Sequence, residues 1–301
     1  MNCVETIDLT FGYSKHETII NNLNLKIENG VIYGFLGPNG AGKTTTLKLI
    51  LGILKGKQGR IKIFDQELAN NRVKILSKVG CLLETPSIYS HLTAFENLKV
   101  WGNLYPCPKK RIDEVLEIVG LTDAKNKKAG AFSLGMKQRL GIGISLLNEP
   151  GVLILDEPSN GLDPNGILDL RLMLKRINNT DKTTIILSSH LLAEIEKTVS
   201  HVGIISKGAL LFQGTLAELQ LKQKQSAYLV IETNNLARAM EVISANNIQP
   251  ALLNGKLTIP AVGNEIISNL NKQLIDNQVE VHQITIVKND LESTFIELTK
   301  N

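Results

Sequence analysis

The sequence lacks a long hydrophobic run. No apolar stretch approaches the ~18–20 residues that a membrane-spanning helix needs, so we expect no transmembrane segment. The residues after Met1 include neither the basic nor the apolar region of a secretory signal, and we expect no such signal. The sequence also lacks a strong excess of one charge. Its 33 Lys and Arg residues nearly balance 29 Asp and Glu residues, which gives a net charge of +4. So small a charge, without a clustered basic patch, predicts no nucleic-acid partner.

Cysteine is scarce. The three cysteines, Cys3, Cys81 and Cys107, are scattered and lack the spacing of metal ligands. We interpret them as free thiols in a reducing compartment. The remaining composition, with 43% hydrophobic and 21% charged residues, is ordinary for globular proteins and excludes wholesale disorder. At ~150 residues per domain, a chain of 301 residues predicts about two domains.

Residues 1–221 have the pattern of an α/β domain. Short β-branched runs alternate with helical patterns, which is typical of a largely parallel sheet. We predict strands at 31–36, 78–83, 151–155 and 183–188, and a helix at 44–54. The stretch 87–150 interrupts this rhythm and is predicted to be an inserted helical subdomain, with helices at 94–104, 109–119 and 136–147.

Residues 222–301 are predicted to form a second, smaller domain after a polar linker at 222–226. The expected elements are a strand at 228–232, a helix at 236–245, a hairpin at 251–259 that turns at Asn254 and Gly255, a helix at 264–273 and a strand at 279–287. This βαββαβ order is typical of a ferredoxin-like α+β domain. A further helix is expected at 291–298. A regulatory or dimer-supporting module and a passive cap both remain open as its role.

A glycine-rich segment between a predicted strand and a predicted helix matches the phosphate-loop pattern G-x-x-x-x-G-K-[ST]. Its glycines let successive backbone N–H groups point at an anion, and the helix N-terminus adds a positive dipole. We expect Lys43 to reach the β- and γ-phosphates of ATP and the Thr44 hydroxyl to bind Mg²⁺. The predicted nucleotide-binding residues are Gly37, Pro38, Asn39, Gly40, Ala41, Gly42, Lys43, Thr44 and Thr45.

Two acids end an apolar strand. Asp156 and Glu157 follow the predicted strand at 151–155, and such a strand delivers them to the sheet edge where nucleotides bind in open α/β folds. Asp156 is predicted to bind Mg²⁺ through its water shell. Glu157 is predicted to polarise the attacking water as a general base. Two solvated acids before a Pro158 turn would be the alternative.

The segment from Phe132 to Leu140 resembles the signature of the ATP-binding cassette family, L-S-G-G-Q followed by x-Q-R-L. The positions that match are Ser133, Gly135, Gln138, Arg139 and Leu140, whereas Leu134 and Met136 replace a glycine and a glutamine. Ser133 and the backbone N–H of Gly135 precede a predicted helix, which makes a second anion site. The resemblance implies that this site contacts the γ-phosphate of ATP bound to the opposite subunit.

Other segments extend the resemblance over residues 1 to about 218. Residues 159–163 look like the D-loop, which crosses the dimer interface, and Asp163 is its candidate nucleotide contact. His190 looks like the switch histidine, a catalytic residue that hydrogen-bonds the γ-phosphate; a structural histidine is the alternative. Tyr13 stands where the family stacks an aromatic ring on adenine, with a core aromatic as the alternative.

Glu84 departs from the family pattern. It occupies the place of a glutamine that touches Mg²⁺ and the attacking water, so we include Glu84 among the metal ligands. A carboxylate there is similar to the variant in bacitracin-resistance and lantibiotic-immunity exporters. The signature without its second glycine and glutamine, and the ending at 290–298, fit the same branch. Neutral drift at Glu84 is the alternative.

The resemblance implies the fold of a P-loop ATP-binding cassette domain with ATP and Mg²⁺ as cofactors. Two chains would form a head-to-tail homodimer around two ATP molecules. Hydrolysis would drive a separate membrane permease, which places the chain at the cytoplasmic face of the cell membrane. The cargo implied is a lantibiotic or other peptide antibiotic. Export of sodium, a small drug or polysaccharide, and a non-transport ATPase acting on ribosomes or DNA, remain as alternatives.

Overall fold

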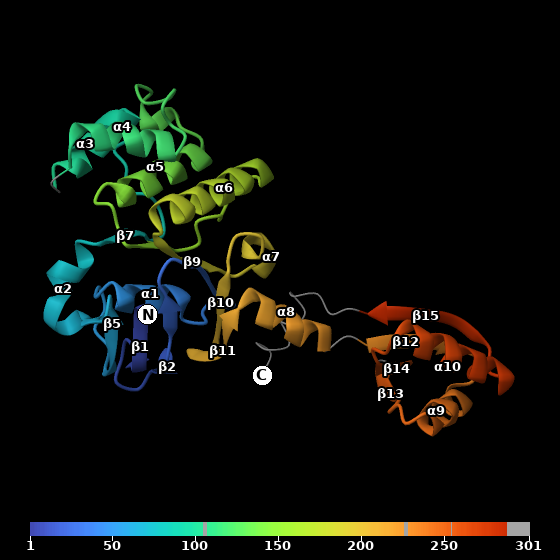
Figure 1. Cartoon of the computed structure of the whole chain (residues 1–301). Helices are drawn as coiled ribbons and strands as arrows, with labels where there is room; N and C mark the ends of the chain where they lie inside the picture. The colour runs from blue at the N-terminus through green and yellow to red at the C-terminus, as the bar shows by residue number, and fades with distance from the viewer. Residues whose placement is uncertain (105–106, 226–227, 254, 288–301) are drawn as a thin grey trace. The chain divides into compact units, whose positions relative to one another are not determined.

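The computed structural model describes residues 1–104, 107–225, 228–253 and 255–287. Within these ranges the chain divides into two compact units, of which the first runs from Met1 to Leu216 and the second begins at Ala217 (Figure 1). In the part of the chain that is described, no helix is long and apolar enough to cross a membrane.

A six-stranded sheet forms the centre of the first unit. Its strand order is β11-β10-β4-β9-β8-β7, and all neighbours pair in parallel except β10 and β11. The bounds are β4 (Ile32–Leu36), β7 (Val79–Leu82), β8 (Val152–Leu155), β9 (Thr184–Ser189), β10 (His201–Ser206) and β11 (Ala209–Thr215). Every residue of β4, β8 and β9 is buried, as expected for parallel strands covered on both faces. The mainly parallel sheet that the sequence predicts is therefore confirmed.

A second, antiparallel sheet, which the sequence analysis did not anticipate, belongs to the same unit. Its strand order is β2-β1-β5-β6, with β3 paired to β1. The bounds are β1 (Asn2–Phe11), β2 (Ile20–Leu23), β3 (Lys26–Glu28), β5 (Gln58–Ile63) and β6 (Gln66–Glu67). Buried side chains from both sheets, including Val4, Ile63 and Phe35, share one core cluster with Leu47 of helix α1 (Lys43–Ile50).

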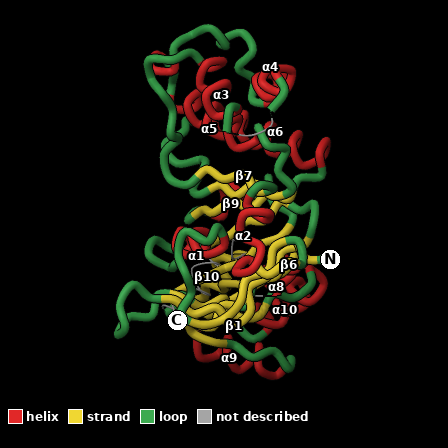
Figure 2. The backbone as a smooth tube through the Cα atoms, turned by 90° about the vertical axis from the view of Figure 1, so that its left-hand side faces the viewer, coloured by secondary structure: helices red, strands yellow, loops and turns green. Residues whose placement is uncertain are grey.

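Of the remaining helices of the first unit, α3, α4, α5 and α6 lie together at one end, beyond β7, whereas α2 lies beside the strands (Figure 2). Their bounds are α2 (Leu68–Leu76), α3 (Ala94–Gly102), α4 (Lys109–Ile118), a 3₁₀ turn at Ala129–Ala131, α5 (Leu134–Leu146), α6 (Pro164–Asp181) and α7 (Leu192–Ile195). Helices α3, α4 and α5 pack on one another and form the helical insertion. Helix α5 begins two residues before the predicted start, because the Ser133 hydroxyl caps it by accepting a hydrogen bond from the Met136 N–H.

The second unit has its own sheet, in the order β13-β14-β12-β15, with every pairing antiparallel. Its elements are β12 (Tyr228–Thr233), α9 (Leu236–Ala245), β13 (Ala251–Leu253), β14 (Lys256–Pro260), α10 (Asn264–Asp276) and β15 (Val281–Val287). This is the βαββαβ order expected from the sequence. A separate core joins the sheet to both helices, with Leu229 and Ile231 against Ile243 and Leu274.

One prediction near the junction is wrong. Residues 222–225 were expected in a polar linker, but they belong to helix α8 (Leu216–Gln225). Its Leu, Lys, Gln, Glu and Ala residues have high helix propensity, and this preference outweighs the polar character of the segment. Asn254 at the hairpin turn and the expected helix at 291–298 lie outside the described residues.

Candidate nucleotide site

The loop between β4 and α1 is built to bind an anion. Gly40 and Gly42 have φ angles of 79° and 107°, in the left-handed region that glycine adopts without a steric penalty. Gly42 is also the N-cap of α1, and no side chain caps this helix. The N–H groups of its first turn are therefore available to a ligand, and the helix dipole favours a negative one.

A cavity of about 530 Å³ opens over this loop. Its lining brings together the predicted loop residues and two predicted catalytic residues that lie far along the chain. The lining residues are Ile19, Asn39, Gly40, Gly42, Lys43, Thr44, Thr45, Glu157, Asn160 and His190. Ile19 and Asn160 are additions to the predicted set. The remaining loop residues, Gly37, Pro38 and Ala41, lie in the same loop, and Ala41 N–H donates to the Pro38 carbonyl.

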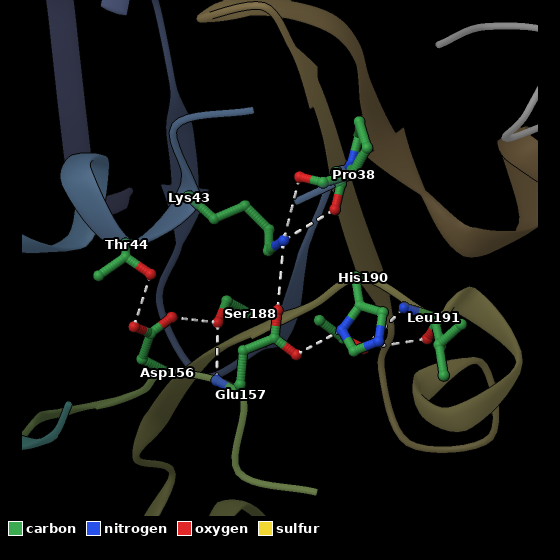
Figure 3. Close-up of polar contacts among 10 residues, drawn as sticks. Pro38, Lys43, Thr44, Asp156, Glu157, Ser188, His190 and Leu191 are labelled. Carbon is green, nitrogen blue, oxygen red and sulfur yellow. Dashed lines mark hydrogen bonds and ion pairs between the residues drawn. The ribbon is translucent and has the colours of Figure 1, made fainter. Parts of the chain in front are cut away.

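Lys43 is a buried cation with three acceptors around it. Its side chain is 6% exposed, and Nζ lies 2.8 Å from the Gly37 carbonyl oxygen, 3.4 Å from that of Pro38 and 3.2 Å from Oε1 of Glu157. An ammonium group has three N–H donors, so all three are engaged (Figure 3). The loop thus holds Lys43 at the cavity wall, where a phosphate oxygen could accept one of these donors.

Asp156 is held by two hydroxyl groups from different elements. Thr44 Oγ1 donates to its Oδ2 at 2.8 Å, and Ser188 Oγ lies 2.6 Å from its Oδ1 (Figure 3). The same Ser188 oxygen accepts from the backbone N–H of Glu157 at 2.8 Å. Ser188 was absent from the predicted site. The sequence does place Ser188 as a polar residue near the carboxyl end of a buried strand. It does not show that this strand lies beside β8, so the contact with Asp156 could not be predicted.

Glu157 and His190 both line the cavity and contact each other. Nδ1 of His190 lies 2.9 Å from Oε2 of Glu157, while Oε1 of the same carboxylate contacts Lys43. Glu157 has a φ of 48°, an uncommon conformation for a residue with a side chain. Backbone strain of this kind gathers where function demands a fixed side-chain direction. A carboxylate placed in this way can accept a proton from a water molecule in the cavity.

Glu84 lies on the loop after β7, outside the cavity lining. It is paired with Lys48 of α1, whose Nζ is 2.8 Å from Oε1 of Glu84. The Lys48 hydrogen bond and charge lower the pKa of the Glu84 carboxyl, and the same contact raises the pKa of Lys48. The negative charge of Asp156 also contributes to the raised pKa of Lys48. The role of Glu84 as a metal ligand stays a prediction.

The predicted signature residues lie around a different cavity, of about 370 Å³, which shares no lining residue with the first. Ser133 and Gly135 reach it from the start of α5, and Asp163 reaches it from the N-terminus of α6. Asp163 caps that helix by accepting from the Gly166 N–H at 2.9 Å. Leu134, which replaces a glycine of the family pattern, lines this cavity and is half exposed.

Tyr13 is 61% exposed, so it is not a core aromatic. Its ring packs edge-on against Phe11, with centroids 5.0 Å apart. Phe11 is buried and therefore fixes one side of the Tyr13 ring. Stacking of this ring on adenine stays a prediction.

The donors around the cavity fit a nucleoside triphosphate with a divalent cation. Backbone N–H groups and a buried ammonium suit phosphate, while Thr44 and Asp156 supply the oxygen ligands that Mg²⁺ prefers. Among the described residues, no cluster of three or more His, Cys, Asp or Glu side chains could hold a metal alone.

Comparisons with known proteins agree with this geometry. Residues 20–160 match the family model of ABC transporters. The bacitracin transport ATP-binding protein BcrA of Bacillus licheniformis is 40% identical over 98% of this chain and 96% of its own length. The lantibiotic transport ATP-binding protein SrtF of Streptococcus pyogenes is 40% identical over 68% of this chain and 88% of its own length.

Solved structures give the same result. CbiO1 of Clostridium perfringens, part of the ABC transporter complex CbiONQ, superimposes with a TM-score of 0.69 at 27% identity, over 74% of this chain and 92% of its own. The dimeric post-hydrolysis structure of the ATP-binding cassette MJ0796 with ADP and Pi gives 0.63 at 25% identity, over 71% and 98%.

The fold and the site thus define a P-loop ATPase of the cassette type. The chain belongs to the ATP-binding cassette family of transporter ATPases, which couple ATP hydrolysis to transport.

Proposed function

We propose that this chain is the ATPase subunit of an exporter that protects against lantibiotics or other peptide antibiotics. Two relatives support this cargo, because their names describe bacitracin transport and lantibiotic transport. Glu84 and the altered signature, with Leu134 in place of glycine, fit the same branch. The BcrA relative matches over nearly the whole chain, so the second unit is included in the likeness.

The observation that carries the mechanism is the separation of two half-sites. The phosphate loop with Glu157 lines one cavity, and Ser133 with Asp163 lines another that shares none of its residues. A second copy, related by a two-fold axis, would bring Ser133 and Gly135 to the ATP of its partner and complete both sites. The dimeric ADP-bound relative supports this arrangement.

Within each site the residues have distinct tasks. The loop N–H groups and Lys43 would bind the phosphates, and Thr44 and Asp156 would hold Mg²⁺, with Glu84 as a further ligand. When bound, Mg²⁺ would neutralise charge at the transferred phosphoryl group. Glu157 accepts the proton of the attacking water, and His190 orients the Glu157 carboxylate through their 2.9 Å contact.

The membrane partner is a separate permease, and the chain acts from the cytoplasmic face. A groove of about 280 Å³ between β7, α3 and α5 supports this proposal. Its lining includes Trp101, whose buried indole Nε1 has no hydrogen-bond partner within the described residues.

The test has two parts. A tagged full-length chain, expressed with its neighbouring genes, is purified from membranes, and we expect a membrane subunit to copurify. Cells with the wild-type chain or with Glu157→Gln are then challenged with a nisin-like peptide, bacitracin and an unrelated small drug. Only the wild-type chain should raise survival, and only against peptides. Protection against the small drug alone would point to another cargo, and copurification with ribosomes or DNA would contradict the exporter.

A further inference from the structure

Helix α1 presents two polar side chains one turn apart to two carboxylates. Thr44 and Lys48 are separated by four residues, so they lie on the same helix face. Thr44 Oγ1 donates to Asp156 at 2.8 Å, and Lys48 Nζ lies 2.8 Å from Glu84. One face of α1 therefore binds both acidic residues that follow strands β8 and β7 of the six-stranded sheet.

The two carboxylates come from neighbouring strand ends. Strands β7 and β8 pair in parallel, with Leu82 opposite Leu155, and the Asp156 N–H donates to the Leu82 carbonyl at 2.9 Å. Glu84 follows only two residues after Leu82. The loop that carries Glu84 therefore starts beside the strand end that carries Asp156. Lys48 Nζ contacts Oε1 of Glu84 at 2.8 Å, one turn of α1 after the Thr44 hydroxyl that donates to Asp156.

The backbone of Glu84 is held in an uncommon conformation. Its φ is 59°, in the left-handed region that residues with a β-carbon rarely adopt. Such a conformation persists only when surrounding contacts maintain it. The Lys48 ammonium supplies such a contact for the Glu84 side chain. The loop after β7 is therefore fixed to α1 through this ion pair.

We propose that Lys48 is a positioning residue for Glu84, an inference that rests on the proposed place of Glu84 in the nucleotide site. Lys48 binds one carboxylate oxygen, Oε1, which leaves the second oxygen as the one that would serve Mg²⁺ or one of its waters. The ammonium also cancels the negative charge that Glu84 would otherwise bring close to the γ-phosphate. The Lys48–Glu84 pair then carries the zero net charge of the glutamine that the family has at this position.

An exposed ion pair without function is the opposing explanation, because most such pairs contribute little. The chain offers a matched control. In the second unit, Lys256 Nζ lies 2.6 Å from Oε1 of Glu232, and these side chains are 59% and 41% exposed. The Lys48 and Glu84 side chains are 29% and 65% exposed. Removal of Lys256 deletes a comparable pair that belongs to the other unit.

The experiment is a double-mutant cycle on the purified full-length chain. The variants are Lys48→Gln, Glu84→Gln, the double variant, Lys48→Arg and Lys256→Gln. Steady-state ATPase assays give the KM for ATP and the Mg²⁺ concentration for half-maximal activity, and a titration with a fluorescent ATP analogue, with and without Mg²⁺, gives the binding affinity without turnover. Lys48→Gln should raise the KM by about threefold or more, because Glu84 is then an uncompensated charge. Glu84→Gln should raise the Mg²⁺ requirement, since an amide is a weaker ligand than a carboxylate.

The double variant decides the outcome. It carries a neutral pair, so its KM should return to within about twofold of the wild-type value. Lys48→Arg and Lys256→Gln should match the wild type. Recovery in the double variant also excludes misfolding as the cause of the Lys48→Gln defect, and thermal denaturation checks this directly.

Three results would overturn the proposal: an unchanged KM in Lys48→Gln, a double variant as impaired as Lys48→Gln, or an equal defect in Lys256→Gln. A Glu84→Gln chain with wild-type KM and Mg²⁺ dependence would also remove Glu84 from the site. None of these results bears on the exported cargo, which the survival test decides separately.

Discussion

His190 Nδ1 lies 2.9 Å from Oε2 of Glu157 in the first unit. Because an ionised carboxylate only accepts hydrogen bonds, the shared proton belongs on Nδ1. The opposite ring nitrogen, Nε2, then accepts in the neutral ring and donates in the protonated ring. Glu157 therefore sets the ring orientation and the tautomer of His190, and the two residues act as one unit.

Glu157→Gln tests the proton acceptor of this unit. The amide keeps the shape of the side chain but cannot take the proton of a water molecule, so turnover should fall by about 10²–10⁴. ATP binding should persist, and an ATP-bound dimer should accumulate. Steady-state ATPase assays and size-exclusion chromatography with ATP measure both effects. Turnover near the wild-type rate would show that Glu157 is not the base.

Lys43→Ala removes the buried ammonium that we propose binds the phosphates. Lys43 is 6% exposed, so its charge acts with little screening by water. The loss should lower ATP affinity by on the order of tenfold or more, along with turnover, because the charge acts in the ground state and the transition state alike. A binding titration with a fluorescent ATP analogue measures it. Unchanged affinity would refute the phosphate-binding role of Lys43.

Ser188→Ala tests a residue that only the structure revealed. The substitution removes the 2.6 Å contact to Asp156 and leaves the Glu157 N–H without its acceptor, a cost of about 1–3 kcal/mol. Turnover should drop by about tenfold or more. Ser145→Ala is the matched control, because Ser145 is also buried and its hydroxyl donates to the Ile142 carbonyl within α5. Equal activity in the two variants would exclude a functional role for Ser188.

The cysteines allow a footprint of the groove between β7, α3 and α5, where we propose that the permease docks. Cys81 lines the groove, and desolvation by the neighbouring atoms raises the pKa of its thiol. Alkylation at alkaline pH should therefore label Cys81 in the isolated chain and spare it in the membrane complex. Cys3 should stay unlabelled in both, because it is fully buried and burial raises the pKa of its thiol to about 11. Mass spectrometry reads the labelling, and equal labelling of Cys81 in both samples would argue against docking at this groove.

Sequence reasoning found the parts of the site that are encoded locally. The phosphate loop is read from eight consecutive residues, and Asp156 and Glu157 are read from the apolar strand that precedes them. Ser188 could not be found in this way, because its role depends on the parallel pairing of β8 and β9, in which Leu155 lies opposite Leu187. That pairing joins segments 32 residues apart.

Two other features could not be predicted from the sequence, because they also depend on contacts between distant segments. Nothing in the sequence distinguishes Lys48 from other polar residues of a helix. Its contact with Glu84, 36 residues further along the chain, arises only in the folded structure. The antiparallel sheet pairs β1 with β5, so Val4 lies opposite Ile63. Its short strands carry register shifts that blur the two-residue alternation by which strands are recognised. The second unit was easier, because its hairpin and helices follow one another closely along the chain.

The sheet core of the first unit and the core of the second unit have a consequence for cooperativity. The core around Tyr33 and the core around Leu229 have no residue in common. Unfolding is cooperative within a core, so the chain should melt as two calorimetric domains. A ligand that binds only the native state stabilises the part to which it binds. Mg²⁺ and ATP should therefore shift one endotherm to higher temperature and leave the other in place, which would let a single heating scan distinguish nucleotide-site damage from damage to the C-terminal unit.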